Sequence, residues 1–446
     1  MGTTAMKHRN PAWLAGIVFA SYIIVLASAA QAAPGHHKHA DPACAVALAP
    51  HPGNSKWVRK VNVLQGQALR LSNDADVLEQ LAWVYLERAR VRQQPSDLAL
   101  LQTAADCLHA SQPTAARFFS AYVLYSQHQF HAAEELVREV AGERGLPADF
   151  ALLGDALLEQ GRLDEAAEVY QRLMNLKPGP GAYLRAAWIR QQRGQLDGAV
   201  EFARLAARAV GAPTTPAAAW FHMQFANILF ERGDLDSSSQ VLAGVLRMDT
   251  DNPDARLLHG KLALARTDVP SAVESLVRAV DAAPMPIMQW ALIEAYRLAG
   301  NFDAAAVEER NLLAYGNRLD PRTTALYLAH TGQDLRRARR MLEHEIQDRR
   351  DVATVDGLAW VLHQAGEHRQ AWALIEQALE WGTLNPRVHL HAALIARAMG
   401  DEAAFRLHAD VSRSFAQSLF PSERRMLERV STDFAALIGA RRNRAG

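Results

Sequence analysis

Small and apolar residues recur with a helical spacing over most of the chain. Between residues 153 and 178, they return every three or four positions, which is the spacing of one buried face of an α-helix. Gly161 interrupts this spacing, and the pattern resumes at Leu163. Glycine adopts a left-handed backbone conformation at little cost, so the segment predicts two antiparallel helices joined by a tight turn at Gly161.

The same turn recurs along the chain with a period of about 34 residues. Most of the turns are followed five positions later by alanine, where a small side chain lets two helices approach closely. No segment shows sustained alternation of period two, so we predict an all-α chain of about ten helix pairs with almost no strand. The expected turn residues are His128, Gly161, Gly194, Gly233, Thr267, Gly300, Gly332, Gly366 and Gly400.

The segment around Gly161 closely resembles a tetratricopeptide repeat (TPR). Leu153, Gly154, Ala166, Tyr170 and Pro178 fit the spacing of small, apolar and proline positions in that family. The resemblance covers roughly residues 70–415. It implies a right-handed TPR-type α-solenoid of about ten helix-turn-helix repeats, in which contacts run only between neighbouring repeats.

The sequence divides into four regions. We expect a signal peptide in residues 1–32, a flexible arm rich in proline, glycine and histidine in residues 33–56, and the TPR solenoid in residues 57–415. Residues 416–446 are expected to form a C-terminal capping helix and a basic tail. The helix is expected to run through Met426 and Phe434 and to cover the last apolar edge.

The first 32 residues have the order of an export signal. Lys7 and Arg9 precede an apolar run over residues 13–26, and Ala30-Gln31-Ala32 provides small residues for cleavage. We therefore predict a periplasmic or secreted protein whose mature chain begins near Ala33. The alternative is an uncleaved membrane anchor, because residues 11–30 have about the length of a membrane span.

Prolines and glycines interrupt any helix in residues 33–56. His36, His37 and His39 lie in this arm with Cys44, and such side chains bind zinc, copper or nickel. The three histidines are candidate metal ligands, and the alternative is a polar spacer that binds no metal. A catalytic metal is not expected, because a flexible arm does not hold an open coordination site in place. The pairing of Cys44 with Cys107 stays open.

Composition and motifs exclude several functions. The chain is 49% hydrophobic and has 48 basic and 48 acidic side chains, so it is neither disordered nor a duplex nucleic-acid binder. It contains no nucleophile elbow, H-E-x-x-H motif or glycine-rich phosphate loop, so we predict no enzyme activity and no cofactor. The pairs His363/His368 and His389/His391 are not spaced for one helix face, and we expect partly exposed side chains there rather than ligand pairs.

The resemblance implies that a partner binds on the concave surface, which the first helix of each pair lines. Aromatic side chains are common at the positions expected to face this surface. They suit interface hot spots and stacking on sugars, and the alternative is that they pack between helices. Only Asn227 and Lys261 match positions of the lysine/asparagine clamp of chaperone-tail-binding members, so carboxylate recognition is not expected. The candidate partner-binding residues are Trp83, Tyr122, Trp188, Trp220, Asn227, Trp290 and Trp360.

The sequence therefore predicts a non-enzymatic scaffold of the cell envelope that binds a protein partner in the groove of a TPR solenoid. Two alternatives stay open. One is a carbohydrate-associated factor that holds a glycan chain, and the other is a metal-handling accessory protein that uses the histidine-rich arm. Nucleic acid is not an expected partner, and contact with a membrane is expected only through an uncleaved signal or through a partner.

Overall fold

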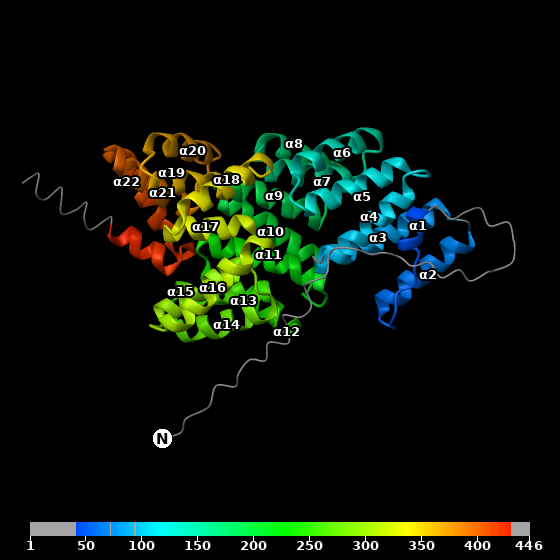
Figure 1. The fold of residues 1–446 in the computed structure, drawn as a ribbon, viewed down its shortest axis with the longest axis horizontal. Helices are drawn as coiled ribbons and strands as arrows, with labels where there is room; N and C mark the ends of the chain where they lie inside the picture. The colour runs from blue at the N-terminus through cyan, green and yellow to red at the C-terminus, as the bar shows by residue number, and fades with distance from the viewer. Residues whose placement is uncertain (1–41, 72, 93–94, 430–446) are drawn as a thin grey trace, which may run out of the picture. The chain divides into compact units, whose positions relative to one another are not determined.

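The computed structural model describes residues 42–71, 73–92 and 95–429, which belong to one structural unit. All regular secondary structure within these ranges is helical, and the helices follow one another as antiparallel pairs (Figure 1). The predicted TPR-like solenoid is therefore confirmed. None of the helices in these ranges is long and apolar enough to cross a membrane.

Ten helix pairs form the solenoid. They are α3 (Ala75–Arg92) with α4 (Pro95–Leu108), α5 (Pro113–Ser126) with α6 (Phe130–Glu143), α7 (Pro147–Glu159) with α8 (Leu163–Leu176), α9 (Pro180–Gln192) with α10 (Leu196–Val210), α11 (Pro216–Arg232) with α12 (Leu235–Met248), α13 (Pro253–Ala265) with α14 (Val269–Ala282), α15 (Pro286–Leu298) with α16 (Phe302–Leu319), α17 (Pro321–Thr331) with α18 (Leu335–Asp348), α19 (Val352–Gln364) with α20 (His368–Glu380), and α21 (Pro386–Met399) with α22 (Glu402–Ser414). Helices α1 (Pro42–Ala47) and α2 (Lys56–Arg70) precede them. The short 3₁₀ helix η2 (Ala416–Ser418) and helical residues 421–429 follow them.

The turns lie where the sequence places them. Every expected turn residue has a left-handed backbone, including Gly161 with φ 72° and Gly400 with φ 80°. His128 and Thr267 adopt the same conformation with φ 62° and 60°, although an L side chain is disfavoured there. The period of the repeat therefore identifies the turn even where glycine is absent.

Close packing within a pair explains the small residues of the motif. Gly154 on α7 lies directly against the ring of Tyr170 on α8, and a Cβ atom at this position would overlap the ring. Gly260 on α13 meets the side chain of Leu276 on α14 in the same way. A small residue at this position is what allows the two helices of a pair to approach.

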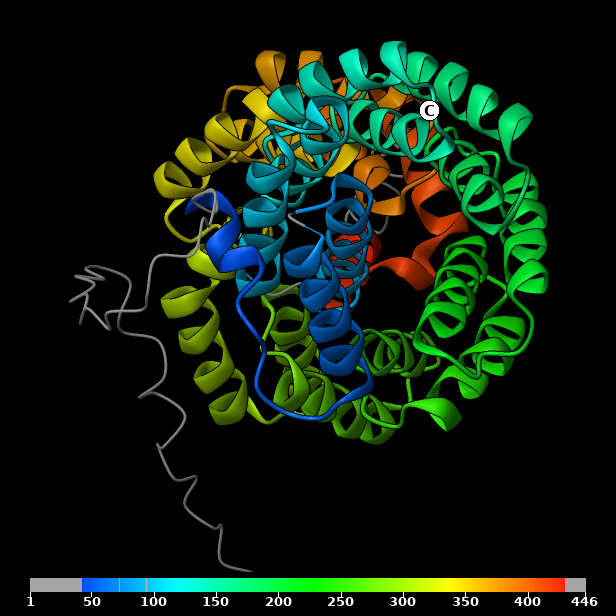
Figure 2. The ribbon, with the colours of Figure 1, turned by 90° about the vertical axis from the view of Figure 1, so that its right-hand side faces the viewer.

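The solenoid also makes contacts between repeats that are far apart in sequence. The turn at Gly161 lies against Trp381, which follows α20, and Gly194 lies against Gly382. The guanidinium of Arg349 is 2.8 Å from the carboxylate of Glu159. Figures 1 and 2 show α18 and α20 beside the α6–α9 region. The expectation that contacts run only between neighbouring repeats is therefore wrong, because the superhelix curves back onto itself.

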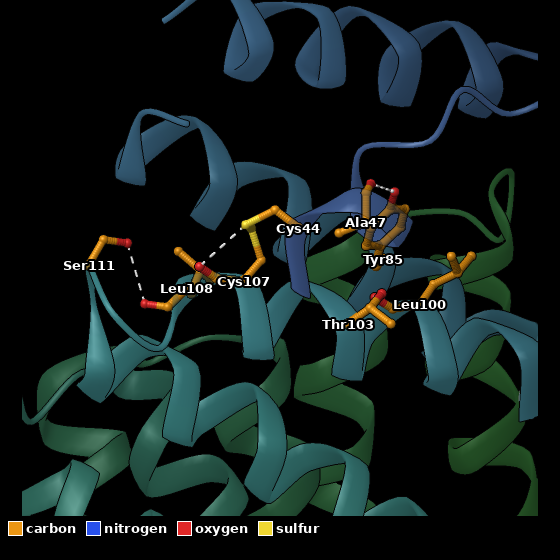
Figure 3. Close-up of a disulfide and its surroundings, with 8 residues drawn as sticks. All are labelled: Cys44, Ala47, Tyr85, Leu100, Thr103, Cys107, Leu108 and Ser111. Atoms are coloured by element: carbon orange, nitrogen blue, oxygen red, sulfur yellow. Dashed lines mark hydrogen bonds between the residues drawn. A yellow bond between two sulfur atoms is a disulfide. The ribbon is translucent and has the colours of Figure 1, made fainter. Parts of the chain in front are cut away.

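A disulfide joins the N-terminal helix to the solenoid. Cys44 of α1 is bonded to Cys107 of α4, and both residues are buried (Figure 3). The Tyr85 hydroxyl donates a hydrogen bond to the carbonyl of Ala47 at 2.8 Å. The part of the expected arm from residue 42 onward is thus packed against α3 and α4. His36, His37, His39 and the export signal lie outside the described residues.

Candidate functional site

The residues expected to line the concave surface differ in exposure. Trp290 on α15 and Trp360 on α19 are buried, with 1% and 6% of their surface exposed. Trp220 on α11 is 42% exposed. The remaining candidates are half-buried: Trp83, Tyr122, Trp188 and Asn227. The candidate surface therefore has an N-terminal part, from α3 to α11, and a C-terminal part.

Trp290 is covered by a later segment of the same chain. Residues 415–429, which we call the C-terminal segment, lie inside the ring of helices in Figure 2. The ring centroid of Phe420 is 5.1 Å from that of Trp290, and the Arg387 guanidinium is 4.9 Å from the same ring. His330 on α17 packs against the indole at 5.3 Å. In the C-terminal part, the occupant of the concave surface is therefore the protein itself.

A polar network holds the C-terminal segment in this position. The backbone N–H and the hydroxyl of Ser422 donate to the two carboxylate oxygens of Glu294, at 3.0 and 2.7 Å. The Nε2 atom of His330 lies 2.8 Å from the Ser422 hydroxyl. Burial raises the pKa of Glu294 and lowers the pKa of His330 to about 4. Both shifts favour the uncharged forms at this buried contact.

An ion pair and two backbone contacts extend the attachment. The Glu423 carboxylate is paired with Arg387 on α21 and accepts the Phe420 N–H at 2.7 Å. Burial opposes ionisation of Glu423, but the charge of Arg387 prevails and lowers the pKa to about 2. Arg424 donates to the Leu264 carbonyl at 2.8 Å, and Gln417 donates to the Glu231 carbonyl at 3.0 Å. The expected capping segment thus also ties the last repeat to α11 and α13.

Trp360 belongs to the packing between helices. Its ring stacks on His391 of α21 with centroids 4.2 Å apart and on His363 at 5.0 Å. The Nδ1 atom of His391 is 2.8 Å from the Asp356 carboxylate. The rings of His363 and His368 lie 4.8 Å apart. For Trp360, this packing corresponds to the alternative considered from the sequence.

The expectation for the paired histidines needs correction. His389 and His391 are buried rather than partly exposed, with 6% and 4% of their surface exposed. The Nδ1 atom of His389 lies 3.0 Å from that of His408 on α22. Spacing along one helix did not indicate these contacts, because the neighbouring rings come from other helices. Within the described ranges, no group of three or more side chains is arranged to hold a metal ion.

The aromatic side chains of the N-terminal part are fixed by their neighbours. The ring centroid of Trp83 is 5.3 Å from those of Phe118 and Phe119 on α5. Trp188 meets Trp220 edge to face at 6.1 Å, which is the one contact between two of the predicted aromatic residues in the described structure. Such contacts restrict the side chains before any partner binds.

Charged side chains accompany the aromatic residues. Arg185 donates to both carboxylate oxygens of Asp155, at 2.7 and 2.5 Å, and its guanidinium lies 5.9 Å from the Trp188 ring. Asn227 donates to Glu231 at 3.1 Å. Burial raises the pKa of Glu231 and lowers the pKa of Lys261. Asn227 and Lys261 thus belong to a half-buried polar region of the solenoid.

A cavity that we did not predict lies between α2 and α3. It has a volume of about 570 Å³ and is lined by cationic and apolar side chains, including Trp83. Lys56, Arg59 and Lys60 provide the cations from α2. Their spacing on one helical face was visible in the sequence, but α2 was not recognised as a partner of α3.

Comparison with known proteins agrees with the fold. Models of the tetratricopeptide repeat match residues 120–183, 152–213, 223–284 and 257–314. The chain contains tetratricopeptide repeats at these residues. TPR domains generally bind protein partners, and members of the family are usually non-enzymatic scaffolds. No curated protein matches the sequence of this TPR protein.

Several solved structures are similar to part or most of this chain. A structure titled human IFIT1 dimer with PPP-AAAA is 14% identical, with 81% of this chain and 89% of that chain covered and a TM-score of 0.44. PilW, titled a type IV pilus biogenesis factor, is 13% identical over 46% of this chain and 94% of its own, with a TM-score of 0.39. Yeast Tom70 is 13% identical over 84% and 91%, with a TM-score of 0.37.

Proposed function

We propose that this TPR protein is a non-enzymatic scaffold of the cell envelope that binds a protein partner on the N-terminal part of its concave surface. One observation carries the proposal. Trp290 is covered by residues 415–429 and Trp360 is packed between helices, whereas the candidate side chains from α3 to α11 keep exposed surface. These side chains are Trp83, Tyr122, Trp188, Trp220 and Asn227.

Two features support a location in the envelope. The first 32 residues have the order of an export signal. The buried Cys44–Cys107 disulfide is of a kind that persists in oxidising compartments and is rare in the cytosol. Together they favour a periplasmic or secreted protein.

The chemistry of the N-terminal part suits a protein partner. Trp188 and Trp220 present large rings whose orientation is already restricted, so binding costs little side-chain entropy. Arg185, which is paired with Asp155, lies beside Trp188. Tryptophan and arginine are the residue types that most often dominate the binding energy of interfaces.

The test compares Trp188→Ala with Trp290→Ala. With a partner isolated from an envelope extract, Trp188→Ala is expected to weaken binding by about 2 kcal/mol or more and to change unfolding less. Trp290→Ala is the matched control, because it removes a buried ring and is expected to cost about 3–5 kcal/mol of stability. Loss of stability in Trp188→Ala with unchanged affinity per folded molecule would contradict the proposal.

A glycan-binding function is the second candidate, because the exposed ring of Trp220 suits stacking on a sugar. Titration of the mature protein with oligosaccharides distinguishes it from protein binding. If Trp220→Ala lowers affinity for a glycan but not for the protein partner, the glycan function is favoured.

The metal-handling alternative rests on His36, His37 and His39. It is abandoned if their triple alanine variant binds Ni²⁺, Cu²⁺ and Zn²⁺ as tightly as the mature protein does.

A further inference from the structure

The cavity between α2 and α3 lies at the N-terminal end of the proposed binding surface. We call it the α2–α3 cavity and define it by Lys56, Arg59, Lys60, Val63 and Trp83. Trp83 belongs both to this cavity and to the row of candidate binding residues. The cavity therefore continues the proposed surface beyond the first repeat.

The cavity carries an excess of positive charge. Its lining includes three cations from α2 but only one carboxylate, that of Glu87 on α3. Lys60 and Glu87 are 3.8 Å apart and are 58% and 71% exposed, so their attraction is weak. Arg59 donates to the neutral carbonyl of Asn54. Among the described residues, neither Lys56 nor Arg59 has a carboxylate at ion-pair distance.

The same cavity offers an apolar contact surface. Val63 is 56% exposed, and Leu64 and Val84 also line the cavity. Trp83 is held in place by α5 and by a hydrogen bond from its indole N–H to Glu79 at 3.3 Å. An apolar side chain placed against Val63 and Trp83 would gain burial without ordering a flexible tryptophan.

We propose that the α2–α3 cavity binds an acidic segment of the partner protein. An apolar side chain of that segment lies against Trp83 and Val63, and its carboxylates face Lys56, Arg59 and Lys60. This inference rests on the proposed scaffold function and specifies the class of partner. Aliphatic lining favours a peptide over a glycan. The equal numbers of acidic and basic residues in the chain disfavour a nucleic acid.

Charge reversal provides the main test. The probe is a fluorescein-labelled synthetic peptide in which glutamates flank one phenylalanine, and its glutamine counterpart serves as the neutral probe. Fluorescence anisotropy of the mature protein should show tighter binding of the glutamate peptide, with a difference that shrinks as salt is added. The variant Lys56→Glu/Arg59→Glu/Lys60→Glu should bind that peptide about tenfold more weakly or worse.

Two controls separate local charge from general effects. Arg336→Glu/Arg340→Glu changes exposed cations on α18 and should leave the affinity unchanged. A peptide with lysines in place of the glutamates should bind the reversed variant better than it binds the unaltered protein. Val63→Glu, a single exposed substitution, should also weaken binding of the acidic peptide and provides a second test should the triple variant fold poorly.

Three results would overturn the inference. The first is equal affinity for the glutamate and glutamine peptides. The second is unchanged binding of the glutamate peptide by both the triple charge-reversal variant and Val63→Glu. The third is tighter binding of single-stranded DNA than of the glutamate peptide. The scaffold function is tested separately with the isolated partner. If the partner still binds the reversed variant but not Trp188→Ala, the cavity assignment fails while the proposed function stands.

Discussion

The carboxylate of Glu423 forms an ion pair with Arg387 inside the concave surface, 36 positions away along the chain. The side chain of Glu423 is 1% exposed, and that of Arg387 is 26% exposed. The pair joins the helical residues 421–429 to α21, next to the ring of Trp290. Since removing one member leaves the other charge buried, this contact contributes to how firmly the C-terminal segment is held.

Glu423→Gln is expected to lower the free energy of unfolding by about 3 kcal/mol, because Arg387 loses its counter-ion. Urea denaturation at neutral pH measures the change. Glu376→Gln, at an exposed position on α20, is the control and should have little effect. An unchanged midpoint for Glu423→Gln would show that the segment is held mainly by its apolar contacts.

Thr267→Gly is expected to stabilise the protein by about 1 kcal/mol. Thr267 has a φ of 60°, where a β-branched side chain is strained and glycine is not. The reciprocal change Gly300→Thr should destabilise the protein, because Gly300 has a φ of 74° and no neighbouring atoms where a Cβ would lie. Thermal unfolding of both variants tests whether the two stability changes have opposite signs. A loss of stability in Thr267→Gly would show that the backbone at Thr267 is not strained.

Acidification is expected to destabilise the fold through His408. Burial lowers its pKa to about 4, from an ordinary value of 6.5, and the charge of His389 acts in the same direction. The unfolded chain therefore binds more protons than the folded chain between pH 6.5 and 4, and the histidine's contribution to stability is lost as pH falls through this range. His408→Asn should reduce the loss.

Comparing the stability of the unaltered protein with that of His408→Asn at each pH isolates the contribution of His408. Glu159, Glu231 and Glu294 have raised pKa values and act in the opposite direction, but they are present in both proteins. Denaturation midpoints measured from pH 7 to pH 4 provide the check. Parallel pH profiles for the two proteins would rule out a contribution from His408.

Loss of the disulfide is expected to destabilise the N-terminal end by about 4 kcal/mol in the chain-entropy model, because the bond closes a loop of 63 positions. Cys44→Ser/Cys107→Ser should show this loss in denaturation and become insensitive to reductant. The unaltered protein should approach the variant when dithiothreitol is added. Equal stability with and without reductant, after confirmed reduction, would contradict the expectation.

The sequence predicts the structural features that all repeats share. It predicts less well the contacts that only one repeat makes. Gly154, the turn residues and the alanines recur at a fixed period, so the helix pairs and even the turn at His128 were predicted correctly. The contact of Gly161 with Trp381 joins repeats far apart and breaks that period. A repeat motif describes packing between neighbours, so it contains no signal for such contacts.

The candidate site was predicted less completely for the same reason. Trp290 and Trp188 occupy first helices, but residues 415–429 cover only the first of them. Which tryptophan stays exposed depends on where the C-terminal segment runs, and its contacts with Glu294 and Arg387 depend on side chains brought together from α15 and α21. The disulfide similarly depends on how α1 folds onto α4.

The contacts of Glu159 with Arg349 and of Gly194 with Gly382 change the elasticity of the solenoid. An open array of repeats behaves as a spring, because small rotations between neighbours add up to a large change in curvature. Contacts between distant repeats oppose this deformation, because a change of curvature would have to break them. A partner of this protein must therefore match a preset curvature, and shape becomes a criterion of selection alongside charge.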